Sequence, residues 1–278
     1  IFLAFAIGVP LLIIVVYSFL EKPSQGTGVK WVFTLENYKA LFIQEKLDGT
    51  TALDTRYIKV LWTSFYYSLL TTVVTLVLSI PVAMWIATRD ARKRNLLVAL
   101  VTLPFWISIL IRTYGMRQIV ADEGPIGKFL GIFNIEWSIL YSPPATILGL
   151  IYVFLPFMIL PIYASAERFD FRLAEAAYDL GAKRMTVVRR IILPSIRPGV
   201  ISGIALVFIP ALGSFLQSDM LGGGKTNMVA NVIANNFGQA RNWPFGSALA
   251  VLLIVLTLLF VLIMQGAAQR RGDKVELV

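Results

Sequence analysis

The stretch FDFRLAEAAYDLGAKRMTVVRRIILPSIRPG, residues 169–199, carries the strongest local pattern in this chain. Its apolar residues recur at helical spacing, which predicts one helix from Asp170 to Leu180 and a second that ends at Pro194. Asp170 stands at an N-cap position, and Gly181 stands where helices commonly close in the left-handed conformation. The first helix is predicted to have an apolar face formed by Leu173, Ala177 and Leu180. Its opposite, charged face is formed by Arg172, Glu175 and Asp179. The segment should therefore fold as a compact helical hairpin.

On both sides of this hairpin the sequence is dominated by long windows without a charged residue. These windows are 1–20, 60–88, 95–111, 137–166, 198–218 and 242–269. Each has about the length of a helix that crosses a bilayer, roughly 17 to 25 residues. A soluble helix of this length would carry charges on its water-facing side. The windows predict an all-α membrane protein with six transmembrane helices, forming a single domain over residues 1–278.

The composition agrees with a membrane protein and excludes most catalytic chemistry. Hydrophobic residues make up 57% of the chain, and cysteine and histidine are both absent. Disulfides, thiolate nucleophiles, imidazole bases and most transition-metal sites are therefore excluded. The acidic residues lie outside the uncharged windows, and no nucleophile, base and oxyanion donor can be grouped from the sequence. We expect neither catalytic residues nor a metal site.

The distribution of basic residues predicts the orientation in the membrane. Segments 89–95, 165–198 and 268–278 hold 14 of the 25 Lys and Arg residues, so they are expected on the cytoplasmic side. Both termini are then cytoplasmic, and the loop 21–59 lies outside. Within that loop, FTLENYKALF predicts a short amphipathic helix capped by Thr34. The first window has no basic flank, which favours a natural N-terminus upstream of Ile1 over a signal peptide.

The stretch MLGGGKT, residues 220–226, ends like a phosphate-binding loop but does not complete the motif. The pattern G-x-x-x-x-G-K-[ST] requires glycine at the position that Asp219 occupies. A carboxylate there would repel phosphate, and the predicted topology places the stretch on the outer side, away from ATP. We interpret the glycines as a turn that leads out of the fifth span.

Several residues of the predicted hairpin 169–199 match the fixed positions of a known motif. Glu175, Ala176 and Ala177 are followed after three residues by Gly181, and after nine more by Ile191, Leu193 and Pro194. This arrangement resembles the EAA loop, E-A-A-x3-G-x9-I-x-L-P, of the permease subunits of bacterial ABC importers. The whole chain is similar to the type I, MetI-like permeases. It is most similar to the spermidine/putrescine group, through the stretches FTLENY, LPFWISILIRTYG, LVFIPALGSF, SDMLGGGK and RNWPFGSA.

The resemblance implies that transport is divided among several chains. In that family the EAA loop is a coupling helix that sits in a cleft of a separate ATPase, so ATP and Mg²⁺ would bind the partner and this chain would not be an enzyme. The expected partners are a homologous second permease in a heterodimer, two ATPase subunits, an extracytoplasmic binding protein and membrane lipid, with no nucleic acid. Small Ala176 and Ala177 would allow close approach, and Glu175 could pair with a basic residue of the ATPase.

A polyamine cargo would favour carboxylates and aromatic faces along the path, because both stabilise ammonium groups. No uncharged window contributes an acid, so Asp219, directly after the fifth window, is the best-placed carboxylate. Trp106, Tyr152 and Phe215 are the aromatic candidates within the spans, although ordinary packing or lipid contact explains each of them as well.

Other cargoes and other classes of membrane protein remain open at this point. Related ABC permeases carry opines, phosphonate compounds or ferric ions. A secondary carrier without an ATPase would be expected to hold ionisable groups within its spans, and the windows contain none. A membrane scaffold whose basic loops contact anionic lipid is the third interpretation.

Overall fold

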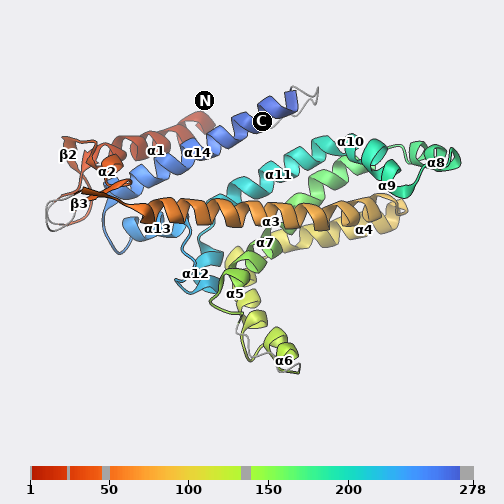
Figure 1. Cartoon of the computed structure of the whole chain (residues 1–278), viewed down its shortest axis with the longest axis horizontal. Coiled ribbons are helices and arrows are strands. Elements are labelled where there is room, and N and C mark those ends of the chain that lie inside the picture. The colour runs from red at the N-terminus through yellow and green to blue at the C-terminus, as the bar shows by residue number, and fades with distance from the viewer. Residues whose placement is uncertain (1, 24–25, 46–50, 133–138, 270–278) are drawn as a thin grey trace. The chain divides into compact units, whose positions relative to one another are not determined.

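The computed structural model describes residues 2–23, 26–45, 51–132 and 139–269, and most of these residues are helical (Figure 1). The long helices are α1 (Phe2–Ser18), α3 (Thr55–Ala87), α4 (Ala91–Thr102), α5 (Ile109–Val120), α7 (Pro143–Glu167), α11 (Arg197–Leu212) and α14 (Trp243–Gln269). The shorter ones are α2 (Glu36–Lys39), η1 (Leu103–Trp106), α6 (Pro125–Ile132), α8 (Arg172–Asp179), α9 (Arg184–Val187), η2 (Val188–Ile192), α10 (Leu193–Ser195), α12 (Leu216–Gly222) and α13 (Val229–Phe237). The all-α prediction is confirmed.

Three helices in the described part of the chain are long and apolar enough to cross a membrane without interruption. They are α3, α7 and α14, and each overlaps one of the uncharged windows. The first window forms α1, whose apolar part is shorter, Phe5–Ser18. Residue 1, and the basic C-terminal residues from 270 onward, lie outside the described residues.

The two remaining windows fall on helix pairs that are sharply bent, so the described residues do not reproduce the expected count of six spans exactly. The pair Ala91–Trp106 and Ile109–Phe129 bends by 97°, and the pair Arg184–Ser195 and Arg197–Leu212 bends by 69°. The first bend occurs where Ile107 and Ser108 leave the helical conformation, with ψ values of 130° and 136°. If each bent pair is one span, the number of candidate spans is five.

The described residues form two compact units, each assembled from separate stretches of the chain. The first unit comprises the described residues within 1–67, 140–146 and 212–260, and the second comprises those within 68–139, 147–211 and 261–278. In the first, Leu41, Val229 and Phe245 belong to one buried cluster. The N–H of Val229 donates to Ser64 Oγ at 2.7 Å, which ties α13 to α3.

The second unit is built around the close approach of α7 and α11. Met158 and Ile162 of α7 and Phe208 of α11 are almost completely buried. Two glycines of α11 allow this approach, because a Cβ on Gly199 would collide with the carbonyl of Pro161 and one on Gly203 with the sulfur of Met158. Small residues are the usual means by which membrane helices pack closely.

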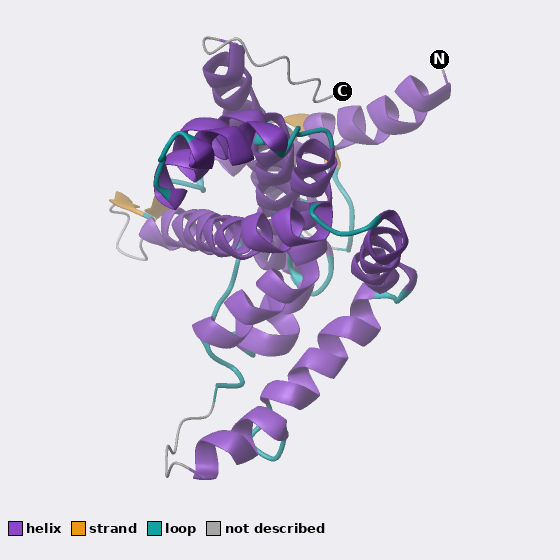
Figure 2. Cartoon of the chain, turned by 90° about the vertical axis from the view of Figure 1, so that its right-hand side faces the viewer, coloured by secondary structure: helices purple, strands orange, loops and turns teal. Residues whose placement is uncertain are grey.

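The loop 21–59 is only partly the amphipathic helix that its sequence suggests. Thr34 Oγ1 does accept the N–H of Glu36 at 3.1 Å, but α2 lasts for one turn. Short antiparallel strand pairs accompany it, β1 (Leu20–Glu21) with β2 (Lys30–Phe33) and β3 (Ile43–Glu45) with β4 (Thr51–Leu53); Figure 2 draws the strands in orange. The predicted apolar face is reduced to one buried residue, Leu41, whereas Leu35 and Phe42 are exposed.

Candidate functional site

The predicted helical hairpin of residues 169–199 is present as two short helical segments joined at Gly181. Asp170 Oδ1 accepts the N–H of Arg172 at 3.1 Å, and α8 follows directly. Gly181 has φ of +80°, and its N–H and that of Ala182 donate to the carbonyls of Tyr178 and Ala177, which closes the helix. The prediction of a left-handed turn at Gly181 is confirmed.

The hairpin has a small core of its own, and the predicted apolar face was wrong. Phe169, Ala174 and Val187 are buried together. The side of α8 that carries Ala174 therefore faces α9 and η2. Leu173 and Leu180 are instead 57% and 88% exposed. Of the predicted apolar face, only Ala177 packs against this core, where it lies beside Phe169, Ala174 and Val187.

The exposed side of α8 carries the first residues of the EAA-like motif. Glu175 and Ala176 are exposed, Ala177 is half-buried, and Leu180 protrudes at the end of the helix. Single exposed apolar side chains are ordinary on protein surfaces, so a partner for this surface is suggested by the motif and not by its exposure. The geometry is that of a knob that can insert into a cleft.

The end of the motif lies on an irregular helical turn. Ile191 belongs to η2, a π-helical turn, and Leu193 and Pro194 belong to α10. The second helix was predicted to end at Pro194, which was wrong, because the helical conformation continues to Ser195. The wider turn, in which the N–H of Leu193 donates to the carbonyl of Val188, accommodates the proline.

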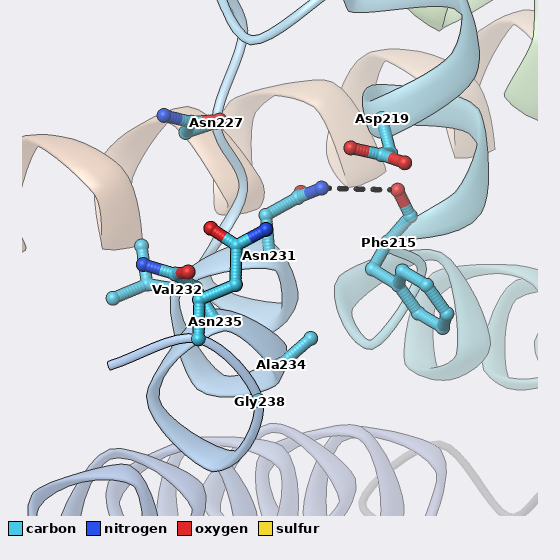
Figure 3. A pocket seen from close by; sticks show the side chains of 9 residues that line it. Phe215, Asp219, Asn227, Asn231, Val232, Ala234, Asn235 and Gly238 are labelled. Atoms are coloured by element: carbon cyan, nitrogen blue, oxygen red, sulfur yellow. Dashed lines mark hydrogen bonds between the residues drawn. The ribbon is translucent and has the colours of Figure 1, made fainter. Parts of the chain in front are cut away.

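A second candidate site is a polar pocket of the first unit, formed by α12, α13 and the residues next to them (Figure 3). Its volume is about 410 Å³. The side chains that give it its chemical character are Phe215, Asp219, Asn227, Asn231, Asn235 and Gln239. The prediction had placed Phe215 and Asp219 on a common path, and the structure brings both to this pocket.

Asn231 fixes the shape of the pocket. Its Nδ2 donates to the carbonyl of Phe215 at 3.1 Å, and its Oδ1 accepts the N–H of Met228 at 3.1 Å. The first bond, drawn in Figure 3, connects α13 to the start of α12. Within the described residues, the side chains of Asp219, Asn227, Asn235 and Gln239 have no hydrogen-bond or ion-pair partner.

The other two predicted path residues belong to the second unit. Trp106 lies at the bend after η1 and is 89% exposed, and Tyr152 lies on α7 and is also exposed. Neither contributes to the pocket of Phe215 and Asp219.

Sequence reasoning missed the amides of the pocket, although the sequence contains a signal for them. In NMVANVIANNFGQ, residues 227–239, an amide side chain returns every four residues, at Asn227, Asn231, Asn235 and Gln239. Four-residue spacing places side chains on one face of a helix. Asn231 and Asn235 lie within α13, and Asn227 and Gln239 flank its two ends, so this repeated spacing could have marked the polar side of the segment.

The Gly-Gly-Gly-Lys-Thr stretch is a turn, as predicted. It follows helix α12, whereas a phosphate-binding loop follows a buried strand. Gly223 and Gly224 adopt φ of +56° and +77°. Thr226 is buried and its hydroxyl lies 3.0 Å from that of Thr146, so it is a structural residue.

Comparisons with known proteins agree with a helical membrane protein. The model of the family described as "Binding-protein-dependent transport system inner membrane component" matches residues 60–273. The spermidine/putrescine transport system permease protein PotB of Escherichia coli K12 is 39% identical over 271 residues, covering 96% of this chain and 94% of that protein. PotB of Haemophilus influenzae is 39% identical over 278 residues, covering 99% and 93%.

Solved structures show the same fold at low sequence identity. A chain of a bacterial alginate ABC transporter, solved in complex with an alginate pentasaccharide-bound periplasmic protein, superposes with a TM-score of 0.73 and 20% identity. The match covers 99% of this chain and 92% of that one.

Proposed function

Since the chain belongs to the family of binding-protein-dependent transport system inner membrane components, we propose that it is a permease subunit of a polyamine ABC importer. It forms half of the path by which spermidine or putrescine crosses the inner membrane. The cargo is inferred from the PotB relatives, which match over nearly their whole length. The pocket with one carboxylate and no lysine or arginine is consistent with a cationic cargo.

In this proposal the energy for transport comes from a separate ATPase that grips the knob of residues 165–198. The observation that carries this step is the exposure of Glu175, Ala176 and Leu180 on one side of α8, while a small core holds the other side rigid. A rigid knob transmits the movement of its partner to α7 and α11, which continue from its two ends. ATP and Mg²⁺ bind the partner, and this chain contributes no catalytic group.

The remaining partners follow from the same assignment. A homologous second permease completes the path, two ATPase subunits bind on the cytoplasmic side together with both termini, and an extracytoplasmic binding protein delivers the polyamine. Trp106, Tyr152, Phe215 and Asp219 contribute weak contacts along the path, since a site that must release its cargo cannot bind it tightly.

The experiment is to co-express the chain with its neighbouring ATPase, permease and binding-protein genes, and to reconstitute the purified assembly in vesicles. Spermidine or putrescine, with the binding protein, should stimulate ATP hydrolysis and be taken up. A Glu175→Ala or Gly181→Val change should reduce co-purification of the ATPase, while a change outside the knob, Ala240→Ser, should not. Stimulation by another solute and not by polyamines would contradict the cargo, and undiminished co-purification would contradict the docking surface.

A further inference from the structure

The pocket between α12 and α13 is lined by oxygen acceptors that the protein itself does not use. Asp219 has no ion-pair partner in the described part of the chain, and the side chains of Asn227, Asn235 and Gln239 make no hydrogen bond there. Surface side chains without partners are ordinary when they are scattered. Here four of them surround one cavity of about 410 Å³, whose wall is held in place by Asn231.

The charge of the pocket indicates the sign of its ligand. Asp219 is its one ionisable lining residue, and its other polar side chains are neutral amides. An amide can turn its oxygen toward a cation, and an ammonium group has three N–H donors and no acceptor. A carboxylate with nearby amide oxygens therefore matches an ammonium group, whereas an anion would meet the uncompensated charge of Asp219.

Phe215 gives the pocket a face for the hydrocarbon part of such a ligand. Its ring lies beside the polar groups and is partly exposed, as Figure 3 shows. The ring offers an apolar surface to methylene groups and a negative face to a cation.

We propose that Asp219, Asn235 and the neighbouring amides bind one ammonium end of a linear polyamine, with its methylene chain over Phe215. The proposal rests on the proposed function for the choice of polyamine, and it assigns a place on this subunit where the cargo binds. Asn231 is a positioning residue, because both ends of its amide are already bonded within the protein. Binding is weak and salt-sensitive, because Asp219 is exposed to solvent.

The absence of cysteine from the chain allows a direct test by protection from a thiol reagent. An Asn235→Cys variant of the full assembly, without binding protein, is labelled with a charged maleimide in the presence of increasing spermidine. Labelling should slow as spermidine fills the pocket. The matched control is Ala240→Cys, since Ala240 is exposed, close in sequence and outside the pocket lining; its labelling should not change.

Two further measurements identify the chemistry. Adding Asp219→Asn to the Asn235→Cys variant should raise the spermidine concentration for half-protection about fivefold, as expected for the loss of an exposed ion pair, and Asp219→Glu should restore most of it. Butane-1,4-diol, which lacks charge, should not protect. Labelling of the Ala240→Cys control in the same backgrounds shows that the fold is retained.

The outcomes separate this site from the function of the whole assembly. If spermidine does not slow labelling of Asn235→Cys, or if Asp219→Asn leaves protection unchanged, the site is wrong even when the wild-type assembly takes up polyamine. If the wild-type assembly takes up no polyamine, the proposed function is wrong.

Discussion

Arg94 Nη2 lies 3.2 Å from Glu167 Oε1, which joins the first turn of α4 to the last residue of α7. Both side chains are partly shielded, at 28% and 39% exposure. Glu167 directly precedes the residues that lead into the knob, and Arg94 belongs to the basic turn after α3. The ion pair therefore ties the N-terminal end of the knob to α4 of the same unit.

Loss of the Arg94–Glu167 ion pair should destabilise the N-terminal end of the knob. We expect Glu167→Gln to lower stability by up to about 1 kcal/mol, the range of partly exposed ion pairs, measured by thermal unfolding of the purified chain in detergent. The charge swap Arg94→Glu with Glu167→Arg should recover part of the loss. Two single changes whose effects simply add in the double variant would show that the side chains do not interact.

Gly181 should be needed for its backbone conformation and not for space. A Cβ at this position meets no atom within 4 Å, but φ of +80° is unfavourable for other residues. We expect Gly181→Ala to cost about 1 kcal/mol and to weaken binding of the ATPase, because the knob changes shape. Gly181→Asn should cost less, since asparagine tolerates this conformation. Equal losses for alanine and asparagine would contradict the explanation.

Leu180 should matter for binding and not for folding. Because the side chain is 88% exposed, Leu180→Asp should change the unfolding free energy by no more than about 0.5 kcal/mol. Its affinity for the ATPase, measured by titration of the purified permease assembly, should fall at least about tenfold. Val187→Ala is the contrasting change, because Val187 is buried and its truncation should cost about 1–2 kcal/mol of stability. A stable Leu180→Asp variant with normal affinity would remove Leu180 from the contact.

The sequence predicted the long helices better than the path of the backbone between them. Absence of charge over 20 or more residues is a direct consequence of burial in lipid, so α3, α7 and α14 could be read from it. The same absence of charge does not indicate whether a helix runs straight through the membrane or bends within it. The 97° bend at Ile107 and Ser108 falls inside an uncharged window whose residues look like those of a straight span.

The candidate sites were predictable to different degrees. The turn at Gly181 follows from local chemistry, and the motif could be aligned residue by residue. The buried side of α8 could not be predicted, because Leu173 and Leu180 are apolar and yet exposed, whereas the small Ala174 is buried. Of the four predicted path residues, Phe215 and Asp219 line the pocket. The amides beside them reach it because α13 folds back toward α12, and the four-residue spacing of those amides does not predict that return.

The turn after α12 should tolerate no side chain at Gly222. A Cβ there would overlap the hydroxyl of Thr226 and approach that of Thr146, so Gly222→Ala should cost about 1–3 kcal/mol. Removing the obstructing hydroxyl with Thr226→Ala should make Gly222→Ala less harmful than in the wild type, although the bond between Thr226 and Thr146 is lost. Thermal unfolding of the four proteins of this cycle tests the overlap, and additive losses would contradict it.

Protonation of Asp54 should lower the stability of the first unit at acid pH. Its carboxylate caps α3, accepting the N–H of Arg56 at 2.9 Å and the guanidinium of the same residue at 2.8 Å, and its side chain is 3% exposed. The Arg56 hydrogen bond and charge lower the pKa of Asp54 below its ordinary value, against the opposing effect of burial. A carboxyl whose pKa is lower in the folded state stabilises the fold above its unfolded pKa of about 3.9. That contribution disappears as the pH falls through the lower folded pKa.

We therefore expect the wild-type chain to lose more stability than Asp54→Asn when the pH is lowered from 5 through the region below about 4. Asparagine keeps an oxygen that can cap the N–H of Arg56, so this variant removes the charge and retains the cap. At pH 6 the wild type should be the more stable protein, and the difference should shrink on acidification. Unfolding midpoints of both proteins across this pH range provide the test. Parallel profiles would show that the carboxylate is not stabilised by Arg56, and the cap alone would then explain the start of α3.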